Sequence, residues 1–296
     1  MSLSGLFIPL ITPFTDDGAL ATDALESLAH SALDAGAAGI VALGTTGEPA
    51  TLTPDERRRV LDICARVCAE RRAQLLAGAS SHSTADSVET LAALDPRITA
   101  ALTVVPYYTR PSEAGVVAHF RHLAAKSPVP LIIYHVPHRT GRILGCGTLR
   151  ELAEIPNVIG FKHAVGGVDD TTVTFLSECA SDTAVLAGDD LHAAALLALG
   201  ATGAILAAAN LATTAYVELV DAWRTGPLET ARTLAHRLAP LSAAVFAEPN
   251  PVVIKAVLAA EGHIPSPAVR LPLLPADAAS TAAALRALNG IRVAAP

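Results

Sequence analysis

Short apolar runs alternate with amphipathic helical patterns along most of the chain, and this alternation restricts the fold more than any other feature. Eight runs have the length and composition of buried strands: residues 6–11, 39–43, 74–78, 100–104, 131–135, 158–162, 184–187 and 203–206. Helical patterns lie between them, as over residues 25–33, where apolar residues recur at the i, i+3, i+4 spacing. Eight strand-then-helix units predict a (β/α)8 TIM barrel, an α/β fold with parallel strands.

A doubly wound open sheet is the alternative, and it usually carries a glycine-rich phosphate turn after its first strand. Here the first run is followed by Thr12-Pro13-Phe14 and has no such turn. After residue 225 the strand pattern stops, and three helical patterns follow at 228–246, 251–262 and 277–288. We therefore expect a catalytic barrel over residues 1–225 and a C-terminal helical domain over residues 226–296.

The composition excludes several classes of function. Acidic residues outnumber basic ones by 28 to 21, so the net charge is −7 and no basic field exists to bind nucleic acid or anionic lipid. Residues 193–217 carry no charge and are long enough to span a bilayer, but Gly200 and Gly203 interrupt them. We expect a buried helix, a tight turn and a buried strand there, and no membrane span.

Neither the N-terminus nor the cysteines indicate secretion. The first residues lack the charged and apolar regions of a signal peptide. Cys64 and Cys68 share an apolar helical stripe, which predicts buried thiols rather than metal ligands, and Cys146 and Cys179 are isolated. A reducing, cytoplasmic setting is expected.

Lysine is rare in this chain, which has only Lys126, Lys162 and Lys255. Lys162 ends the apolar run 158–162, and strand alternation places its side chain inside the barrel with Gly160. Active sites of this fold lie at the carboxyl ends of the strands. An amine shielded from water there can attack a carbonyl carbon and form a Schiff base. The alternative is a structural lysine that pairs with an acidic residue of a neighbouring strand.

Two further side chains are expected at the same end of the barrel. Tyr134 ends the preceding run and lies on the strand next to that of Lys162, where a phenol can relay protons. Arg139 follows in the next loop, where a guanidinium can bind a carboxylate through two parallel hydrogen bonds. A core-edge tyrosine and a solvent-exposed arginine are the respective alternatives.

Two loops complete the candidate site. The segment GTTGE at 44–48 is a hydroxyl-rich turn whose backbone N–H groups can receive a carboxylate. Tyr107 and Tyr108 stand in a proline-bracketed loop after the fourth run, which indicates a rigid contact surface or a packed turn.

The histidines are expected to form hydrogen bonds rather than to bind metal. His135, His138 and His163 lie near the expected site, but no carboxylate is spaced to complete a ligand set with them. His119 and His122 share a helix face without a third ligand, and solvated side chains are predicted there.

Together these segments resemble the dihydrodipicolinate synthase / N-acetylneuraminate lyase family over residues 5–290. The matching motifs occur in family order: GTTGE at 44–48, PYYTRP at 106–111, YHVPHRTG at 134–141, GFKHAVG at 160–166, AGDD at 187–190, GATGAI at 200–205, EPNPVVIK at 248–255 and VRLPLLP at 269–275. The resemblance implies a (β/α)8 barrel with a C-terminal helical domain, usually a homotetramer. It implies a class I aldolase that forms a lysine Schiff base with pyruvate and needs no metal or organic cofactor.

The resemblance also implies the roles of individual residues. Lys162 would form the imine with the 2-oxo acid, and Tyr134 would move protons during imine formation and carbon–carbon bond formation. Thr45 and Thr46 would hold the pyruvate carboxylate, and Thr45 would link to Tyr134.

Four more residues match positions with a family role. Arg139 would bind the carboxylate of the second substrate, and Gly188 and Ile205 would line the pyruvate pocket. Tyr108 would reach into the site of a neighbouring subunit, so that activity would require at least a dimer. The motifs are most similar to those of the synthases, which condense pyruvate with aspartate 4-semialdehyde to 4-hydroxy-tetrahydrodipicolinate in lysine biosynthesis.

Some positions depart from the synthase pattern. His135 stands where synthases usually have Asn, His163 where they have Glu, and Ala79-Ser80 where they have Thr-Gly. These departures leave two alternatives open: another pyruvate-dependent aldolase or dehydratase, of the sugar-acid or 4-hydroxy-2-oxoglutarate type, and a non-catalytic protein that binds a 2-oxo acid. Pro49 and Pro54 replace polar groups of the lysine-inhibited members, which predicts weak or absent feedback by lysine.

Overall fold

The eight strands form a closed parallel barrel in sequence order, as the alternation predicts. The structure is a computed structural model, and it describes residues 3–179 and 183–293. The strands are β1 Gly5–Pro9, β2 Gly39–Ala42, β3 Gln74–Gly78, β4 Ala100–Val104, β5 Leu131–His135, β6 Val158–His163, β7 Ala184–Ala187 and β8 Gly203–Ile205. Nearly every strand residue is buried, which explains why each strand reads as a continuous apolar run rather than as an alternating pattern.

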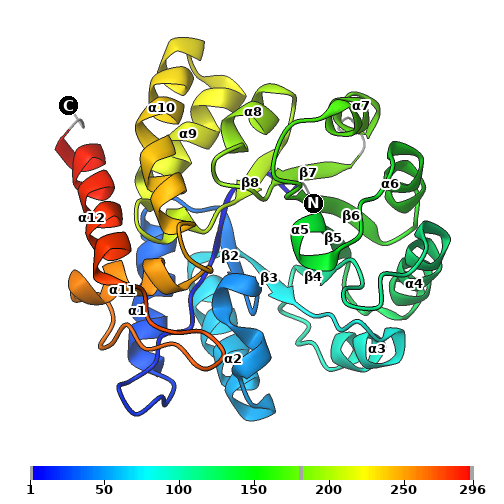
Figure 1. Ribbon diagram of the computed structural model, residues 1–296. Coiled ribbons are helices and arrows are strands. Elements are labelled where there is room, and N and C mark those ends of the chain that lie inside the picture. Colours follow the sequence, from blue (N-terminus) through cyan, green and yellow to red (C-terminus); the bar gives the residue numbers. More distant parts are fainter. Residues whose placement is uncertain (1–2, 180–182, 294–296) are drawn as a thin grey trace. The chain divides into compact units, whose positions relative to one another are not determined.

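The chain divides into two compact units, of which the first comprises Leu75–Ile205 and the N-terminal residues up to Gly5. Its helices are α3 Thr84–Ala92, α4 Glu113–Lys126, α5 Pro137–Thr140, α6 Cys146–Ala153, α7 Asp170–Cys179 and α8 Ala193–Ala198. In this unit α3 packs on α4, α4 on α6, and α6 on α7, so that these helices form one layer on the outer side of the strands (Figure 1).

The second unit comprises Leu6–Gln74 and the chain from Leu206 onward. Its helical elements are α1 Thr22–Asp34, η1 Thr45–Gly47, η2 Pro49–Thr51, α2 Pro54–Arg71, η3 Ala208–Asn210, α9 Thr213–Thr225, α10 Leu228–Val245, α11 Val252–Ala260 and α12 Ala278–Val293. Helix α1 packs on α2, and α10 contacts α9, α11 and α12. The domain boundary expected at residues 225 and 226 falls between α9 and α10 and stays a prediction.

Strand register in the first unit aligns the residues that the sequence singled out. Tyr134 of β5 pairs with Lys162 of β6, and His135 pairs with His163 one position further. The Phe161 ring packs edge-on against Phe175 of α7, at a centroid distance of 5.0 Å. Because side chains alternate along a strand, Lys162 lies on the opposite face from Phe161, as predicted.

The uncharged stretch 193–217 contains α8, β8, η3 and the beginning of α9. In the part of the chain that the structure describes, no helix has both the length and the apolarity needed to cross a membrane. Gly200, with φ +104°, makes the turn between α8 and β8, which is a backbone conformation that glycine adopts most readily.

Buried thiols occur on α2, as predicted. Cys64 and Cys68 are free and buried, and burial raises the pKa of the Cys68 thiol to about 12. Thr53 caps α2 and forms a capping box with Glu56, whose side chain bonds back to the cap. The helix therefore begins at Pro54, directly after its capping residue.

The prediction for His119 is wrong. Its side chain is buried in α4, and its Nδ1 lies 2.8 Å from the hydroxyl oxygen of Thr84. Burial lowers the pKa of His119 to about 4, so the ring is neutral at pH 7. The helical pattern alone did not reveal that α3 packs over this face of α4.

Candidate active site

A buried lysine and a tyrosine lie side by side at the carboxyl ends of β5 and β6. Only 6% of Lys162 and 5% of Tyr134 is exposed. The Lys162 amine lies over the phenol ring, 4.3 Å from its centroid. This position places the amine beside the ring that carries the phenolic oxygen. The structure thus brings together the two residues that the sequence predicted as neighbours.

The alternative role for Lys162, as half of a structural ion pair, does not fit its surroundings. Within the described part of its own unit, no carboxylate lies at ion-pair distance from the Lys162 amine. Lys255 shows what such a pair looks like in this chain, because its amine donates to Glu48 at 2.7 Å. Burying an amine without a counter-ion costs folding free energy, and such groups are typical of functional sites.

Gly188 and Ile205 lie at the carboxyl ends of β7 and β8, the two strands that follow the strand of Lys162. A Cβ atom added to Gly188 would lie 2.7 Å from Cγ and 2.9 Å from Cε of Lys162, so glycine here makes room for the lysine side chain. Ile205 ends β8 and is 1% exposed. Leu186 and Ala187 of β7 pair with Gly203 and Ala204 of β8, so both predicted residues follow a paired strand end.

Arg139 and Tyr108 follow the carboxyl ends of β5 and β4, and both are exposed. Arg139 belongs to the short helix α5, which begins at Pro137 directly after β5. Tyr108 is 87% exposed and has a positive φ of 67°. Its ring meets His82 edge-on at a centroid distance of 6.4 Å, and Tyr107 meets the same imidazole at 5.4 Å. The Tyr108 phenol is therefore held in solvent rather than packed into the core.

In the second unit the predicted threonines form a buried turn. Thr45 and Thr46 begin η1, and only 3% of Thr46 is exposed. The side-chain amide of Asn250 donates to the Thr46 hydroxyl oxygen at 2.9 Å. Because this oxygen already accepts a hydrogen bond, the hydroxyl proton of Thr46 is free to be donated elsewhere.

Next to this turn lies an ion pair that the sequence analysis missed. Glu48 and Lys255 have side chains 2% and 0% exposed, and the Lys255 amine also lies 4.0 Å from the ring centroid of Phe14. Burial lowers the pKa of Lys255, and the Glu48 carboxylate acts in the opposite direction. One signal was available: a lone lysine among the apolar residues of 251–258 requires a buried counter-ion.

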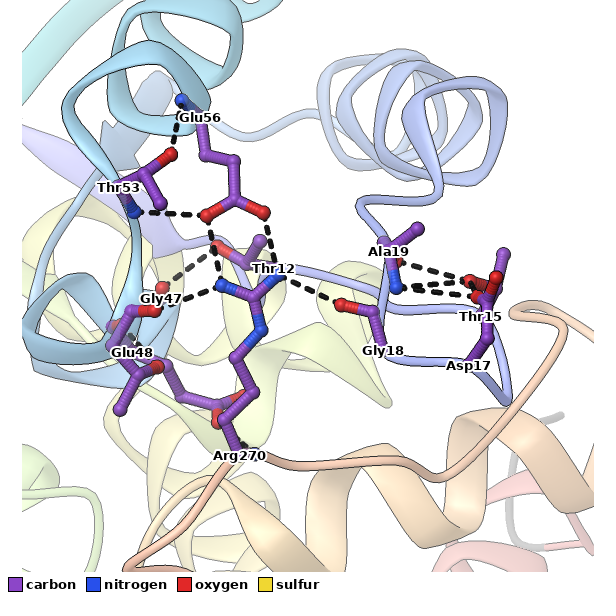
Figure 2. Close-up of polar contacts among 11 residues, drawn as sticks. Thr12, Thr15, Asp17, Gly18, Ala19, Gly47, Glu48, Thr53, Glu56 and Arg270 are labelled. Carbon is purple, nitrogen blue, oxygen red and sulfur yellow. Dashed lines mark hydrogen bonds and ion pairs between the residues drawn. The ribbon is translucent and has the colours of Figure 1, made fainter.

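Arg270 gathers several segments of this unit, as Figure 2 shows. Its guanidinium donates to both carboxylate oxygens of Glu56 and to the carbonyl oxygens of Gly18, at 2.7 Å, and Thr51, at 2.8 Å. The Arg270 side chain holds the pKa of Glu56 down at about 2, mainly through these hydrogen bonds. The chain after α11 is thereby fastened to the beginning of α2.

The two histidines that depart from the synthase pattern lie on the helix side of the strands. The His163 Nε2 is 3.1 Å from the Thr172 hydroxyl, and its ring packs against Phe175 of α7. The His135 ring is 5.6 Å from that of His163. Burial lowers the pKa values of His135 to about 3 and of His163 to about 4, so both are neutral at pH 7. The hydrogen-bonding role predicted for His163 agrees with its contact to Thr172.

The fold and this lysine define the class of the protein: a (β/α)8-barrel lyase of class I, the Schiff-base type. The family model "Dihydrodipicolinate synthetase family" matches residues 2–290. The chain therefore belongs to the dihydrodipicolinate synthetase family.

Individual relatives agree with the family. The 4-hydroxy-tetrahydrodipicolinate synthase of Methanothrix thermoacetophila is 40% identical over 274 residues, which cover 92% of this chain and 91% of that protein. A dihydrodipicolinate synthase from Acinetobacter baumannii, complexed with pyruvate, has a TM-score of 0.94 at 33% identity and covers 99% of this chain and 100% of its own. The dihydrodipicolinate synthase from Cyanidioschyzon merolae, with lysine bound, has a TM-score of 0.92 at 29% identity, covering 98% of each chain.

Proposed function

We propose that this protein is a 4-hydroxy-tetrahydrodipicolinate synthase, which condenses pyruvate with aspartate 4-semialdehyde. The observation that carries the proposal is the buried Lys162 amine, 4.3 Å from the Tyr134 ring centroid, in a chain 40% identical to a protein of that name. The pyruvate bound to the relative from Acinetobacter baumannii supports the choice of the first substrate. The reaction uses no metal and no organic cofactor.

In the proposed reaction, the uncharged Lys162 amine attacks C2 of pyruvate. The carbonyl oxygen leaves as water after it takes up protons, and a protonated imine remains. Loss of a proton from the pyruvate methyl group gives the enamine, whose carbon attacks the aldehyde carbon of the second substrate. Tyr134 would move these protons, because its ring lies beside the amine on the neighbouring strand.

The carboxylates of the two substrates would bind at different residues. The turn that begins with Thr45 and Thr46 offers hydroxyl and backbone donors to the pyruvate carboxylate, and Gly188 and Ile205 would line the pyruvate pocket. The Arg139 guanidinium, exposed in α5 after the strand of Tyr134, would bind the carboxylate of aspartate semialdehyde.

The second candidate is an aldolase or dehydratase of the same family that acts on a sugar acid or a 4-hydroxy-2-oxoglutarate. His135 and His163 motivate it, because they depart from the usual synthase residues. His163 contacts Thr172 and Phe175 of α7, on the other strand face from Lys162. This placement favours the synthase, because substitutions on the helix side leave the inner face of the strands unchanged.

An activity assay separates these candidates. Purified protein is incubated with pyruvate and a panel of aldehydes that begins with aspartate 4-semialdehyde, and loss of both substrates is measured. The synthase consumes aspartate semialdehyde far faster than the other aldehydes. Cleavage of 4-hydroxy-2-oxoglutarate or a sugar acid, with no use of aspartate semialdehyde, would establish the second candidate instead. A protein that binds pyruvate without turnover would be a 2-oxo-acid-binding protein.

Activity would require at least a dimer, and we expect a homotetramer. Tyr108 supports this part of the proposal, since a phenol that is 87% exposed can enter the site of a second copy. Mixing two inactive variants tests it. Tyr108→Phe supplies an intact Lys162, and Lys162→Ala supplies an intact Tyr108, so mixed assemblies should regain activity. If the mixture stays inactive after subunit exchange, Tyr108 acts in its own subunit or not at all.

We expect little feedback inhibition of this protein by lysine. The relative from Cyanidioschyzon merolae has lysine bound. In this chain Pro49 and Pro54 offer no side-chain hydrogen-bonding group, so lysine should inhibit weakly or not at all. Inhibition by micromolar lysine would overturn this expectation.

The buried free thiols of α2 support a reducing, cytoplasmic setting.

A further inference from the structure

The turn that would hold the pyruvate carboxylate contains strained backbone. Glu48 closes η1 in the left-handed conformation, with φ 52° and ψ 41°, which residues with a Cβ atom rarely adopt. Such a conformation persists only where the surrounding contacts impose it. The contacts that hold this turn therefore decide where Thr45 and Thr46 lie.

Two of these contacts come from a segment about 200 residues away in the chain. The Asn250 amide donates to the Thr46 hydroxyl at 2.9 Å, and the Lys255 amine donates to the Glu48 carboxylate at 2.7 Å. Asn250 precedes α11, and Lys255 lies within it. A third contact comes from Thr12, whose hydroxyl donates to the Gly47 carbonyl oxygen at 2.7 Å. The turn is thus held at three successive residues.

The Lys255–Glu48 ion pair contributes little net free energy to holding its two segments together. Both side chains are out of contact with water, and removing two charges from water offsets most of their mutual attraction. Two apolar side chains of similar volume would hold the segments at least as firmly. Unlike apolar packing, the ion pair fixes the orientation of one side chain, the Glu48 carboxylate. Glu48 directly follows the turn that contains Thr45 and Thr46.

The Asn250 amide also affects how the Thr46 hydroxyl can form hydrogen bonds. Its Oδ1 is buried and has no hydrogen-bond partner among the described residues, so only the donating half of the amide is used. A donor at this place occupies an oxygen lone pair of Thr46 and leaves the hydroxyl proton for another acceptor. An acceptor at the same place would capture that proton.

We propose that Asn250 and Lys255 are positioning residues for the substrate carboxylate: they hold Thr46 and Glu48 so that the Thr46 hydroxyl donates to pyruvate. The inference rests on the proposed function for the identity of the ligand. The placement of the turn is a separate claim, and it can be measured without any substrate.

The first test uses a series at Asn250. Asn250→Ala removes the donor, and Asn250→Asp replaces it with a charged acceptor that binds the Thr46 proton and repels a carboxylate. The KM for pyruvate should rise about tenfold in the alanine variant and more in the aspartate variant, with kcat changed by less than about threefold. The matched control is Asn157→Ala, which removes an amide, just before β6, that donates to three carbonyl oxygens between the end of α4 and β5. It should lower the melting temperature and leave the KM unchanged.

The second test concerns the charges. Lys255→Met alone leaves the Glu48 carboxylate buried without a counter-ion and can prevent folding. The double variant Glu48→Gln/Lys255→Met removes both charges together and should fold. Its KM for pyruvate should also rise, while the surface variant Lys126→Met should behave as the wild type. A double variant with the melting temperature, KM and kcat of the wild type would show that the pair does not position the turn.

Hydrogen exchange separates this inference from the proposed function. Amide exchange of the peptide 43–52, read by mass spectrometry without substrate, should be several-fold faster in Asn250→Ala and in the double variant, with little change elsewhere. Unchanged exchange and an unchanged KM overturn the inference. If the wild type does not bind pyruvate, the proposed function fails. The exchange rates then still decide whether Asn250 and Lys255 hold the turn.

Discussion

At the scale of single residues, the chain assigns its buried lysines to two different tasks. Lys255 has a carboxylate partner at 2.7 Å and an aromatic ring beneath it. Lys162 has an aromatic neighbour, and no counter-ion within the described part of its unit. The first arrangement keeps a charge stable in the interior, whereas the second leaves an amine available for reaction.

Gly188 offers a sharp test of how closely Lys162 is packed. A methyl group at this position would lie 2.7 Å from the Lys162 Cγ and 3.0 Å from the Ala164 Cβ, so the lysine side chain must move. Gly188→Ala should therefore lower kcat/KM for pyruvate at least about tenfold, since small misplacements of reacting groups are costly. The control Gly147→Ala in α6 has open space and should leave kcat/KM unchanged. Wild-type activity in Gly188→Ala would show that the Lys162 position is not critical.

The buried histidines make stability depend on pH. Burial holds the pKa values of His135 and His163 at about 3 and about 4, below the 6.5 of an unfolded chain. The unfolded state therefore binds more protons than the folded state as the pH falls through this interval, and stability decreases between pH 6.5 and about 4. Each such histidine contributes a slope of about 1.4 kcal/mol per pH unit.

Urea unfolding at several pH values from 7 to 4 measures this effect. His163→Gln keeps a group that can bond to Thr172 and removes one titrating ring, so the decline in stability toward acid should be less steep. His122→Gln, on the exposed side of α4, is the control and should follow the wild type. An equally steep decline in His163→Gln would mean that other groups cause the acid sensitivity.

At the scale of elements, Arg270 fastens the chain after α11 to α2 and to the loop after β1. Its hydrogen bonds are the main cause that lowers the pKa of Glu56 to about 2, from the 4.5 of an ordinary glutamate. A lowered carboxyl pKa gives stability that is complete above pH 4.5 and is lost as the pH falls toward 2. Arg270→Met should thus reduce stability by roughly 1–3 kcal/mol at neutral pH, since it removes several hydrogen bonds.

The pH dependence of that loss identifies its cause. At pH 3 the Glu56 carboxyl is still mostly ionised in the folded wild type, but it is largely protonated in the unfolded chain, where its pKa is 4.5. The difference in melting temperature between wild type and Arg270→Met should therefore be smaller than at pH 7. A difference of the same size at both pH values would mean that the carbonyl contacts of Arg270, and not Glu56, carry its contribution.

Elements were the most predictable feature of this sequence. Each strand is buried on both faces, so it appears as an uninterrupted apolar run, and the capping box at Thr53 marks the beginning of α2. That Tyr134 and Lys162 lie on neighbouring strands follows from the order of the strands, whereas their exact pairing also depends on a register shift between Leu131 and Ile132. These features depend on residues close in sequence or on neighbouring strands.

Contacts between distant segments were not predictable in the same way. Glu48 and Lys255 are 207 residues apart, and only the packing of α11 in its unit brings them together. His119 is buried because α3 packs over α4, which the pattern of α4 does not encode. The role of Asn250 depends on which atom of its amide faces Thr46, and no sequence pattern predicts the orientation of a single amide group.

At the scale of the whole molecule, the family and the barrel define the class of reaction that the protein can perform, that of a Schiff-base lyase. A model of the dihydrodipicolinate synthetase family matches residues 2–290, nearly the full chain. The central claim is that Lys162 forms a covalent imine with pyruvate. All the proposed substrate-binding roles depend on this single bond.

Borohydride trapping tests this claim most directly. The protein is incubated with pyruvate, reduced with sodium borohydride, digested and mapped by mass spectrometry. The chain has only three lysines, so the labelled peptide identifies the site without ambiguity. We predict a reduced pyruvate adduct on Lys162, none on Lys126 or Lys255, and none in folded Lys162→Ala. An adduct on another lysine, or no adduct in the folded wild-type protein, would contradict the proposed mechanism.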